Sequence, residues 1–72
     1  MDKNKKTELL ADLLEVEPNE IVEGRELESY DSWDSMSKLS LIVLMDDECE
    51  KKLTGEQIRA FKTIGDIMDF MD

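Results

Sequence analysis

Asp34-Ser35-Met36 is the tripeptide of this chain whose residue types and position best fit a chemical role. It follows an acidic stretch that ends at Trp33 and precedes an apolar helical run that begins at Leu39. A helix that begins here places the Ser35 hydroxyl beside unpaired backbone N–H groups and the positive end of the helix dipole. A phosphate joined to Ser35 is stabilised in that field. The pattern therefore predicts a modified serine and not a catalytic one.

The residues that would turn Ser35 into a nucleophilic catalyst are missing from the sequence. The chain contains no histidine, so a Ser-His-Asp triad is impossible. Lys38 is the one basic residue close to Ser35 in sequence, and we expect it to be solvated or to contact the phosphate. A chain of 72 residues is also too short to build both a core and an enclosed active site. We expect a protein that is not an enzyme.

The charge balance restricts the class of partner. Nineteen acidic residues against nine basic ones give a formal net charge of −10. Nucleic acids and anionic membranes select basic surfaces, so neither is an expected partner, whereas proteins with Lys and Arg patches are. The acidic residues do not follow the spacing of an EF-hand loop, so no metal site is expected.

Cys49 is the only cysteine, which excludes an internal disulfide and a cysteine metal cluster. We interpret it as a small buried hydrophobic residue on the apolar side of the second helix, in a reduced, cytoplasmic compartment. The sequence has no secretion signal and no apolar stretch long enough to span a membrane, so no membrane insertion is expected.

Apolar periodicity predicts three main helices and one short helix. A first amphipathic helix covers residues 5–15, and a polar loop at 17–34 follows it, with Ile21, Val22, Leu27, Tyr30 and Trp33 as its anchors. A central helix runs over about 35–51, with Lys51 and Lys52 beside its C-terminal end. Capping boxes at Thr54 and Thr63 start a short helix and a last helix. The predicted fold is an all-α, antiparallel helical bundle in a single domain over residues 1–72.

The region around Ser35 closely resembles the attachment region of acyl carrier proteins. Of the two Asp-Ser pairs, only the count from Ser35 places the family's apolar positions on apolar residues, namely Met36, Leu39, Leu41, Ile42 and Met45. The count from Ser32 places Lys38 among them. The resemblance extends upstream to Leu13–Pro18 and downstream to Thr63–Ile67, and so spans nearly the whole chain.

This resemblance implies that Ser35 carries 4′-phosphopantetheine, transferred from coenzyme A by a magnesium-dependent phosphopantetheinyl transferase. The thiol of that group would hold acyl intermediates as thioesters for fatty-acid, polyketide or other secondary pathway enzymes, with Asp34 supporting the attachment site. The family docks on basic patches of its loading and processing enzymes through the second helix. The residues expected to dock are Met36, Leu39, Val43, Asp46 and Asp47. A monomer is expected.

The chain departs from the housekeeping fatty-acid pattern at Ser37 and Ser40, which occupy positions that are commonly acidic, and at Lys38. This departure suggests a specialised member of the family. Two alternatives stay open at the level of the sequence. The carrier could load an amino acid, as peptidyl or D-alanyl carriers do. Otherwise the chain is a small acidic interaction module without a prosthetic group, in which Asp34-Ser35 only caps a helix.

Overall fold

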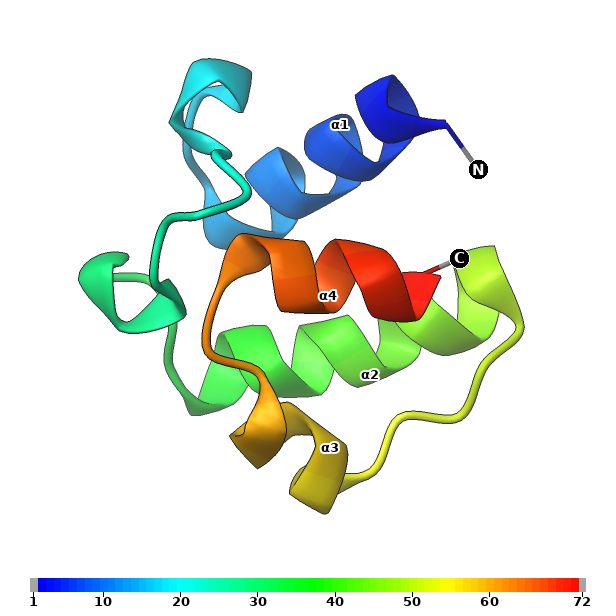
Figure 1. Ribbon diagram of the computed structural model, residues 1–72. Coiled ribbons are helices and arrows are strands. Elements are labelled where there is room, and N and C mark those ends of the chain that lie inside the picture. Colours follow the sequence, from blue (N-terminus) through cyan, green and yellow to red (C-terminus); the bar gives the residue numbers. More distant parts are fainter. Residues whose placement is uncertain (1, 72) are drawn as a thin grey trace.

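Four α-helices and two short 3₁₀ helices follow one another in residues 2–71, the part of the chain that this computed structural model describes (Figure 1). Their bounds are α1 Lys3–Leu14, η1 Pro18–Glu20, η2 Leu27–Ser29, α2 Ser35–Cys49, α3 Gly55–Ala60 and α4 Ile64–Met71. The predicted all-α bundle with three main helices and one short helix is confirmed. The single domain predicted over 1–72 stays a prediction, and its end residues, Met1 and Asp72, lie outside the described part.

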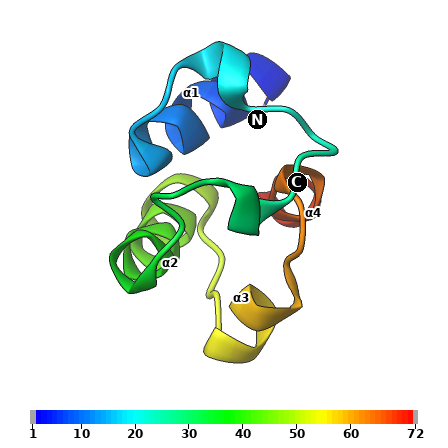
Figure 2. The ribbon, with the colours of Figure 1, turned by 90° about the vertical axis from the view of Figure 1, so that its left-hand side faces the viewer.

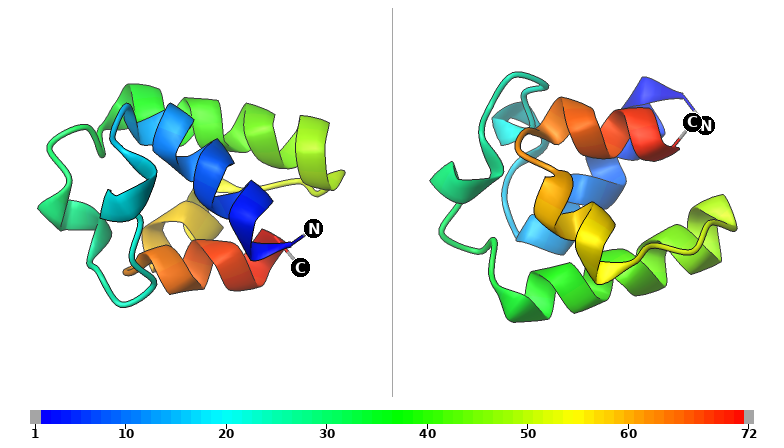
Figure 3. Two further views of the ribbon diagram at one scale, coloured as in Figure 1. Left: turned by 90° about the horizontal axis from the view of Figure 1, so that it is seen from above. Right: turned by 60° about the horizontal axis from the view of Figure 1, so that its bottom comes forward.

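The three longer helices form the bundle, and α3 covers one side of it. α1 runs antiparallel to α2 and α4, whereas α2 and α4 run in the same direction (Figures 1 and 3). Figure 2 looks along α2 and α4 and shows α1 on one side of the pair and α3 on the other. The parallel course of α2 and α4 is made possible by the segment through α3, which returns the chain from the end of α2 to the start of α4.

The core is built mainly from apolar side chains that α1, α2 and α4 turn toward one another, and the long loop, the α2–α3 connection and α3 add further buried side chains. The largest fully buried side chains are Leu10, Leu14, Leu27, Leu41, Met45, Ile64 and Ile67. Within each α-helix these residues are three or four positions apart, which places them on one face. Burial of this face, more than intrinsic helix propensity, stabilises helices of this length.

The predicted starts of α2, α3 and α4 are confirmed, whereas α1 begins at Lys3, two residues before its predicted start, because the Asp2 carboxylate accepts the Lys5 N–H and caps it there. The Asp34 carboxylate accepts a hydrogen bond from the Ser37 N–H at the start of α2, and Thr54 and Gln57 form the expected capping box of α3. At the start of α4, the Thr63 N–H donates to the Asp66 carboxylate, and the Asp66 N–H donates to the Thr63 hydroxyl. Such bonds satisfy backbone donors that have no partner inside a helix.

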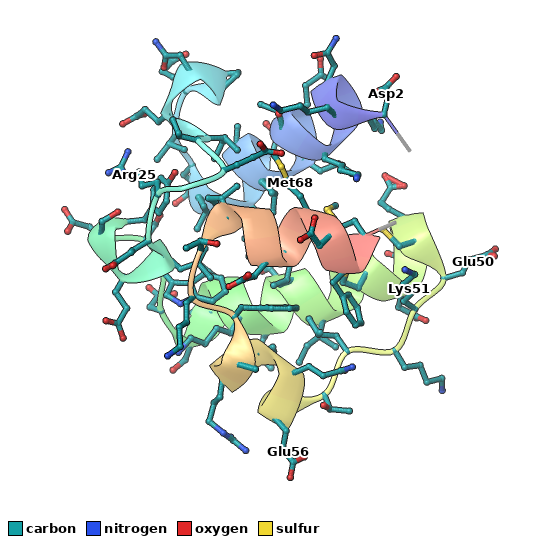
Figure 4. The ribbon with its side chains drawn as sticks, viewed as in Figure 1. Asp2, Arg25, Glu50, Lys51, Glu56 and Met68 are labelled. Carbon is teal, nitrogen blue, oxygen red and sulfur yellow. The ribbon has the colours of Figure 1, made fainter. Side chains whose placement is uncertain are left out.

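The end of α2 differs from the prediction. The helix stops at Cys49, two residues before Lys51, because Glu50 adopts a left-handed conformation with φ of 53° and the Lys51 N–H then donates to the Met45 carbonyl. The Lys51 side chain does not interact with the C-terminal end of α2 as predicted but points toward α4. Its ammonium donates to the Phe70 carbonyl at 2.6 Å and so serves the C-terminal end of α4 (Figure 4).

The long loop between α1 and α2 is held against the bundle by buried anchors and by backbone bonds to the α3–α4 connection. Ile21, Leu27 and Tyr30 are buried as predicted. Val22 is not an anchor, because a turn closed by the Arg25 N–H and the Val22 carbonyl leaves its side chain 53% exposed. The loop also approaches Gly65, where an added Cβ would lie 3.1 Å from the Glu23 carbonyl oxygen.

Candidate functional site

Ser35 is the first residue of α2 and its side chain is exposed. The residue before it, Asp34, is extended and accepts the Ser37 N–H on Oδ1 at 3.0 Å. That hydrogen bond is the main reason why the pKa of Asp34 lies below its usual value. Among residues 2–71, no hydrogen bond engages the Ser35 hydroxyl. The hydroxyl is therefore accessible at a helix N-terminus, where the helix dipole stabilises a phosphate.

The neighbouring serines are engaged in the structure of the loop. The Ser32 hydroxyl donates to the Leu14 carbonyl at 2.6 Å and so ties the loop to the end of α1. Ser37 is buried, and its hydroxyl donates to the Ser32 carbonyl. Of the two Asp-Ser pairs in the sequence, the structure thus leaves only the second with an unengaged and exposed serine. These two side-chain bonds, which the sequence did not predict, set the position of the Ser35 backbone.

Lys38 lies one turn into α2 from Ser35 and is half-buried. Its ammonium is 5.6 Å from the centroid of the Trp33 ring, within the range of a cation–π interaction. Trp33 itself is partly buried against the core, as expected of a loop anchor. The sequence predicted that Lys38 lies in solvent or contacts a phosphate, and the structure places its side chain over the ring of Trp33, two residues before Ser35.

A stripe of apolar residues on α2 faces away from the core. Met36 is 73% exposed, Leu39 is 61% exposed and Val43 is 58% exposed. Asp46 and Asp47, further along the same helix, are exposed as well. Leu39 and Val43 therefore lie outside the core. The predicted docking residues all lie at the surface, and we call these five residues the α2 face.

Two surface cavities flank the start of α2. The first, which we call the basic cavity, has a volume of about 340 Å³ and lies between the long loop, α2 and α3. Its lining includes three basic residues, Lys38, Arg59 and Lys62, and two acidic ones, Glu26 and Glu28. Its apolar walls are Trp33, Ile58 and Phe61.

The second cavity, which we call the acidic cavity, has a volume of about 390 Å³ and lies between α1 and α2. Its charged residues are Asp12, Glu15 and Asp34, and no cation lines it. Neither cavity was predicted from the sequence. Only the spacing of Arg59 and Lys62 around Phe61, in a chain with few basic residues, hinted at the first.

Cys49 and the acidic residues show no sign of a further chemical site. The Cys49 thiol is half-buried and free, and burial raises its pKa, as expected of a side chain that packs against the core. No group of three or more potential metal ligands occurs in the described part of the chain. None of the helices within residues 2–71 is both long and apolar enough to cross a membrane.

The chain is similar in sequence to proteins that all carry the same name. The chain is 30% identical over 69 residues to proteins named "Acyl carrier protein" from Clostridium perfringens strains SM101, ATCC 13124 and 13. The matched segment covers 94% of this chain and 90% of each relative. No protein-family model matches the chain, and no solved structure gives a significant match.

Proposed function

This chain belongs to the acyl carrier protein family, and from that premise we propose that Ser35 is the residue to which 4′-phosphopantetheine is attached. The observation that carries the proposal is the exposed and unengaged Ser35 hydroxyl at the first position of α2. A carrier supplies an attachment point and no catalytic group, which agrees with a sequence that contains no histidine.

In the proposed modification, the Ser35 oxygen attacks the phosphorus of coenzyme A that bears the pantetheine arm. The phosphoanhydride bond breaks, adenosine bisphosphate leaves, and the hydroxyl proton passes to the magnesium-dependent phosphopantetheinyl transferase. A phosphodiester results, and its charge lies at the N-terminus of α2. When bound, the group supplies a thiol that holds acyl chains as thioesters.

The other residues around Ser35 position it. Asp34 caps α2, and the hydrogen bond from the Ser37 N–H that makes the cap also lowers the pKa of its carboxyl group. The bonds of Ser32 and Ser37 hold the loop at the mouth of the helix. Together they present the serine in one orientation to a transferase, which is what preorganisation of a reacting group requires.

We further propose that the α2 face docks the carrier on its enzymes. Exposed Met36, Leu39 and Val43 offer an apolar anchor surface next to Ser35, and exposed Asp46 and Asp47 offer negative charge to basic patches. The partners in this proposal are the transferase and the acyl-loading and acyl-processing enzymes of a fatty-acid, polyketide or other secondary pathway. The proposed carrier works as a monomer in the cytoplasm.

The test is the intact mass of the protein after incubation with coenzyme A, magnesium and a broad-specificity phosphopantetheinyl transferase. We expect a single gain of the mass of one phosphopantetheine. Ser35→Ala is expected to abolish the gain. Ser40→Ala is the matched control, because Ser40 is also an exposed serine of α2, and this variant is expected to gain the mass in full.

A folded chain that gains no mass with several transferases would refute the carrier proposal and leave the acidic interaction module as the explanation. A gain that persists in Ser35→Ala would move the attachment to another residue. Once the mass gain is obtained, loading with acyl and aminoacyl substrates in parallel separates an acyl carrier from a peptidyl or D-alanyl carrier.

A further inference from the structure

The charged residues around the start of α2 are sorted to two sides of the helix. α1 and α3 lie on opposite sides of the α2–α4 pair (Figure 2). On the α3 side, Lys38, Arg59 and Lys62 line the basic cavity, so three of the nine basic residues of the chain gather there. On the α1 side, the charged residues of the acidic cavity are all carboxylates. The two sides of the α2 start therefore differ in charge.

The exposed apolar residues of the α2 face lie between these two sides. Leu39 and Val43 line neither cavity. Successive residues of an α-helix are about 100° apart around its axis, so Leu39 separates Lys38 from Ser40. Lys38 lines the basic cavity and Ser40 lines the acidic one. A protein that docks on Leu39 and Val43 therefore meets a different charge on each side of this contact.

The basic residues of the α3 side are not neutralised by ion pairs within the chain. Among residues 2–71, none of the three takes part in an ion pair within 4.0 Å. The Lys38 ammonium lies 5.6 Å from the centroid of the Trp33 ring, and Arg59 and Lys62 are exposed. Two acidic residues of the long loop line the same cavity, which leaves an excess of one positive charge. The N-terminal end of the α2 dipole adds positive potential nearby.

Negative charge on α2 is confined to the end of the helix far from the serine. No residue between Ser35 and Asp46 is acidic. Asp46 lies eleven residues after Ser35, which corresponds to about 17 Å along the helix axis. On α2 itself, a basic patch of a partner therefore finds carboxylates only at this distance from the serine.

We propose that the enzymes served by this carrier present carboxylate side chains to the basic cavity and Lys or Arg side chains to the far end of α2. The inference rests on the proposed function and names the chemistry of its partners. Trp33, Ile58 and Phe61 give the cavity apolar walls, so a partner segment with an apolar side chain between carboxylates fits it. Opposite charges at two places fix the orientation of the partner, and Lys38 repels an enzyme whose docking face is basic throughout.

The first test measures the charge preference of the basic cavity with three peptides, capped at both ends. Their sequences are Glu-Glu-Leu-Glu-Glu, Gln-Gln-Leu-Gln-Gln and Lys-Lys-Leu-Lys-Lys. Backbone and Trp33 indole resonances of the unmodified chain are followed by two-dimensional NMR in about 0.1 M salt, where charges more than roughly 10 Å away are largely screened. We expect the acidic peptide to shift resonances of the cavity and to bind about two- to ten-fold more tightly than the neutral one. The basic peptide should shift Asp46 and Asp47 instead.

Two variants with matched controls test the basic residues themselves. Arg59→Gln is expected to weaken binding of the acidic peptide about two- to five-fold. Lys52→Gln should leave it unchanged, because Lys52 is exposed and does not line the cavity. With a phosphopantetheinyl transferase whose docking face is basic, Lys38→Glu should raise kcat/KM about two- to five-fold, since it replaces a repulsive charge by an attractive one, whereas Lys52→Glu should not.

The outcomes separate this inference from the proposed function, because the peptides bind a chain that needs no modification. Equal affinities for the acidic and neutral peptides, shift changes outside the basic cavity, equal losses in Arg59→Gln and Lys52→Gln, or no gain in Lys38→Glu would each overturn the inference and leave the carrier function intact. A chain that binds the acidic peptide at the cavity but gains no mass at Ser35 would refute the carrier function and keep the cavity as a docking site for an acidic protein segment.

Discussion

Leu39 and Leu41 have the same side chain on the same helix, but they differ in burial. Leu41 is fully buried, whereas Leu39 is 61% exposed in the α2 face. Truncating each leucine to alanine therefore tests the two effects separately: the loss of a buried side chain and the loss of an exposed one. We expect Leu41→Ala to destabilise the fold and Leu39→Ala to slow the modification of Ser35.

The size of the stability effect follows from burial. Loss of a fully buried leucine side chain removes its transfer free energy and leaves a cavity, which costs about 2–5 kcal/mol. A chain of this length has a total free energy of unfolding of roughly 4–11 kcal/mol. A loss of about 3 kcal/mol lowers the Tm of a domain this small by roughly 12–24 °C. Leu39→Ala opens no cavity and is expected to cost under about 1 kcal/mol.

The assay has two parts. Urea denaturation followed by circular dichroism and by Trp33 fluorescence gives the free energy of unfolding of each variant. The rate of mass gain with coenzyme A and the transferase, at a temperature where both variants are folded, gives kcat/KM. For Leu39→Ala we expect a decrease in kcat/KM of roughly five- to thirty-fold, as for the loss of an apolar anchor in an interface.

If Leu39→Ala destabilises the fold as much as Leu41→Ala does, Leu39 belongs to the core and not to the α2 face. Equal modification rates for Leu39→Ala and the unsubstituted chain would instead remove Leu39 from the docking surface.

Two further predictions concern contacts that hold the bundle together. Lys51→Met removes the hydrogen bond to the Phe70 carbonyl and the cation 5.4 Å from the Phe70 ring. This variant is expected to lower the free energy of unfolding by about 1–2 kcal/mol. Lys52→Met, which changes an exposed lysine, should alter that free energy little. Equal effects of the two variants in urea denaturation would contradict this role of Lys51. Hydrogen bonds from the Lys62 and Thr63 N–H groups hold the pKa of Asp66 below its usual range in the folded chain. Its ionisation therefore stabilises the fold above about pH 4 and ceases to do so as the pH falls through the lowered folded value. Thermal unfolding between pH 7 and pH 2 should show a smaller acid-induced decrease in Tm for Asp66→Asn, and an identical decrease would exclude this contribution.

The helix start at Ser35 was predicted from the sequence because the signals that mark it are local. The apolar spacing through Leu41 and Met45, the cap at Asp34 and the position of Ser35 after it all depend on residues within a few positions of one another. Helix period and capping act over that range. The start of α2 was therefore predicted correctly, and its end was misplaced by only two residues, because the left-handed residue Glu50 carries no glycine signal.

The sequence by itself determined the helices and their caps, the excess of acidic residues and the candidate serine. Only the tertiary structure decided that Ser32 is tied to α1 while Ser35 is not, and that Leu39 lies outside the core. It also decided that Lys51 bonds to the end of α4, and that Lys38, Arg59 and Lys62 line one cavity. These outcomes depend on contacts between residues far apart in the chain. Helical periodicity predicts which residues share one face of a helix. Only the packing of helices against one another decides which face is covered.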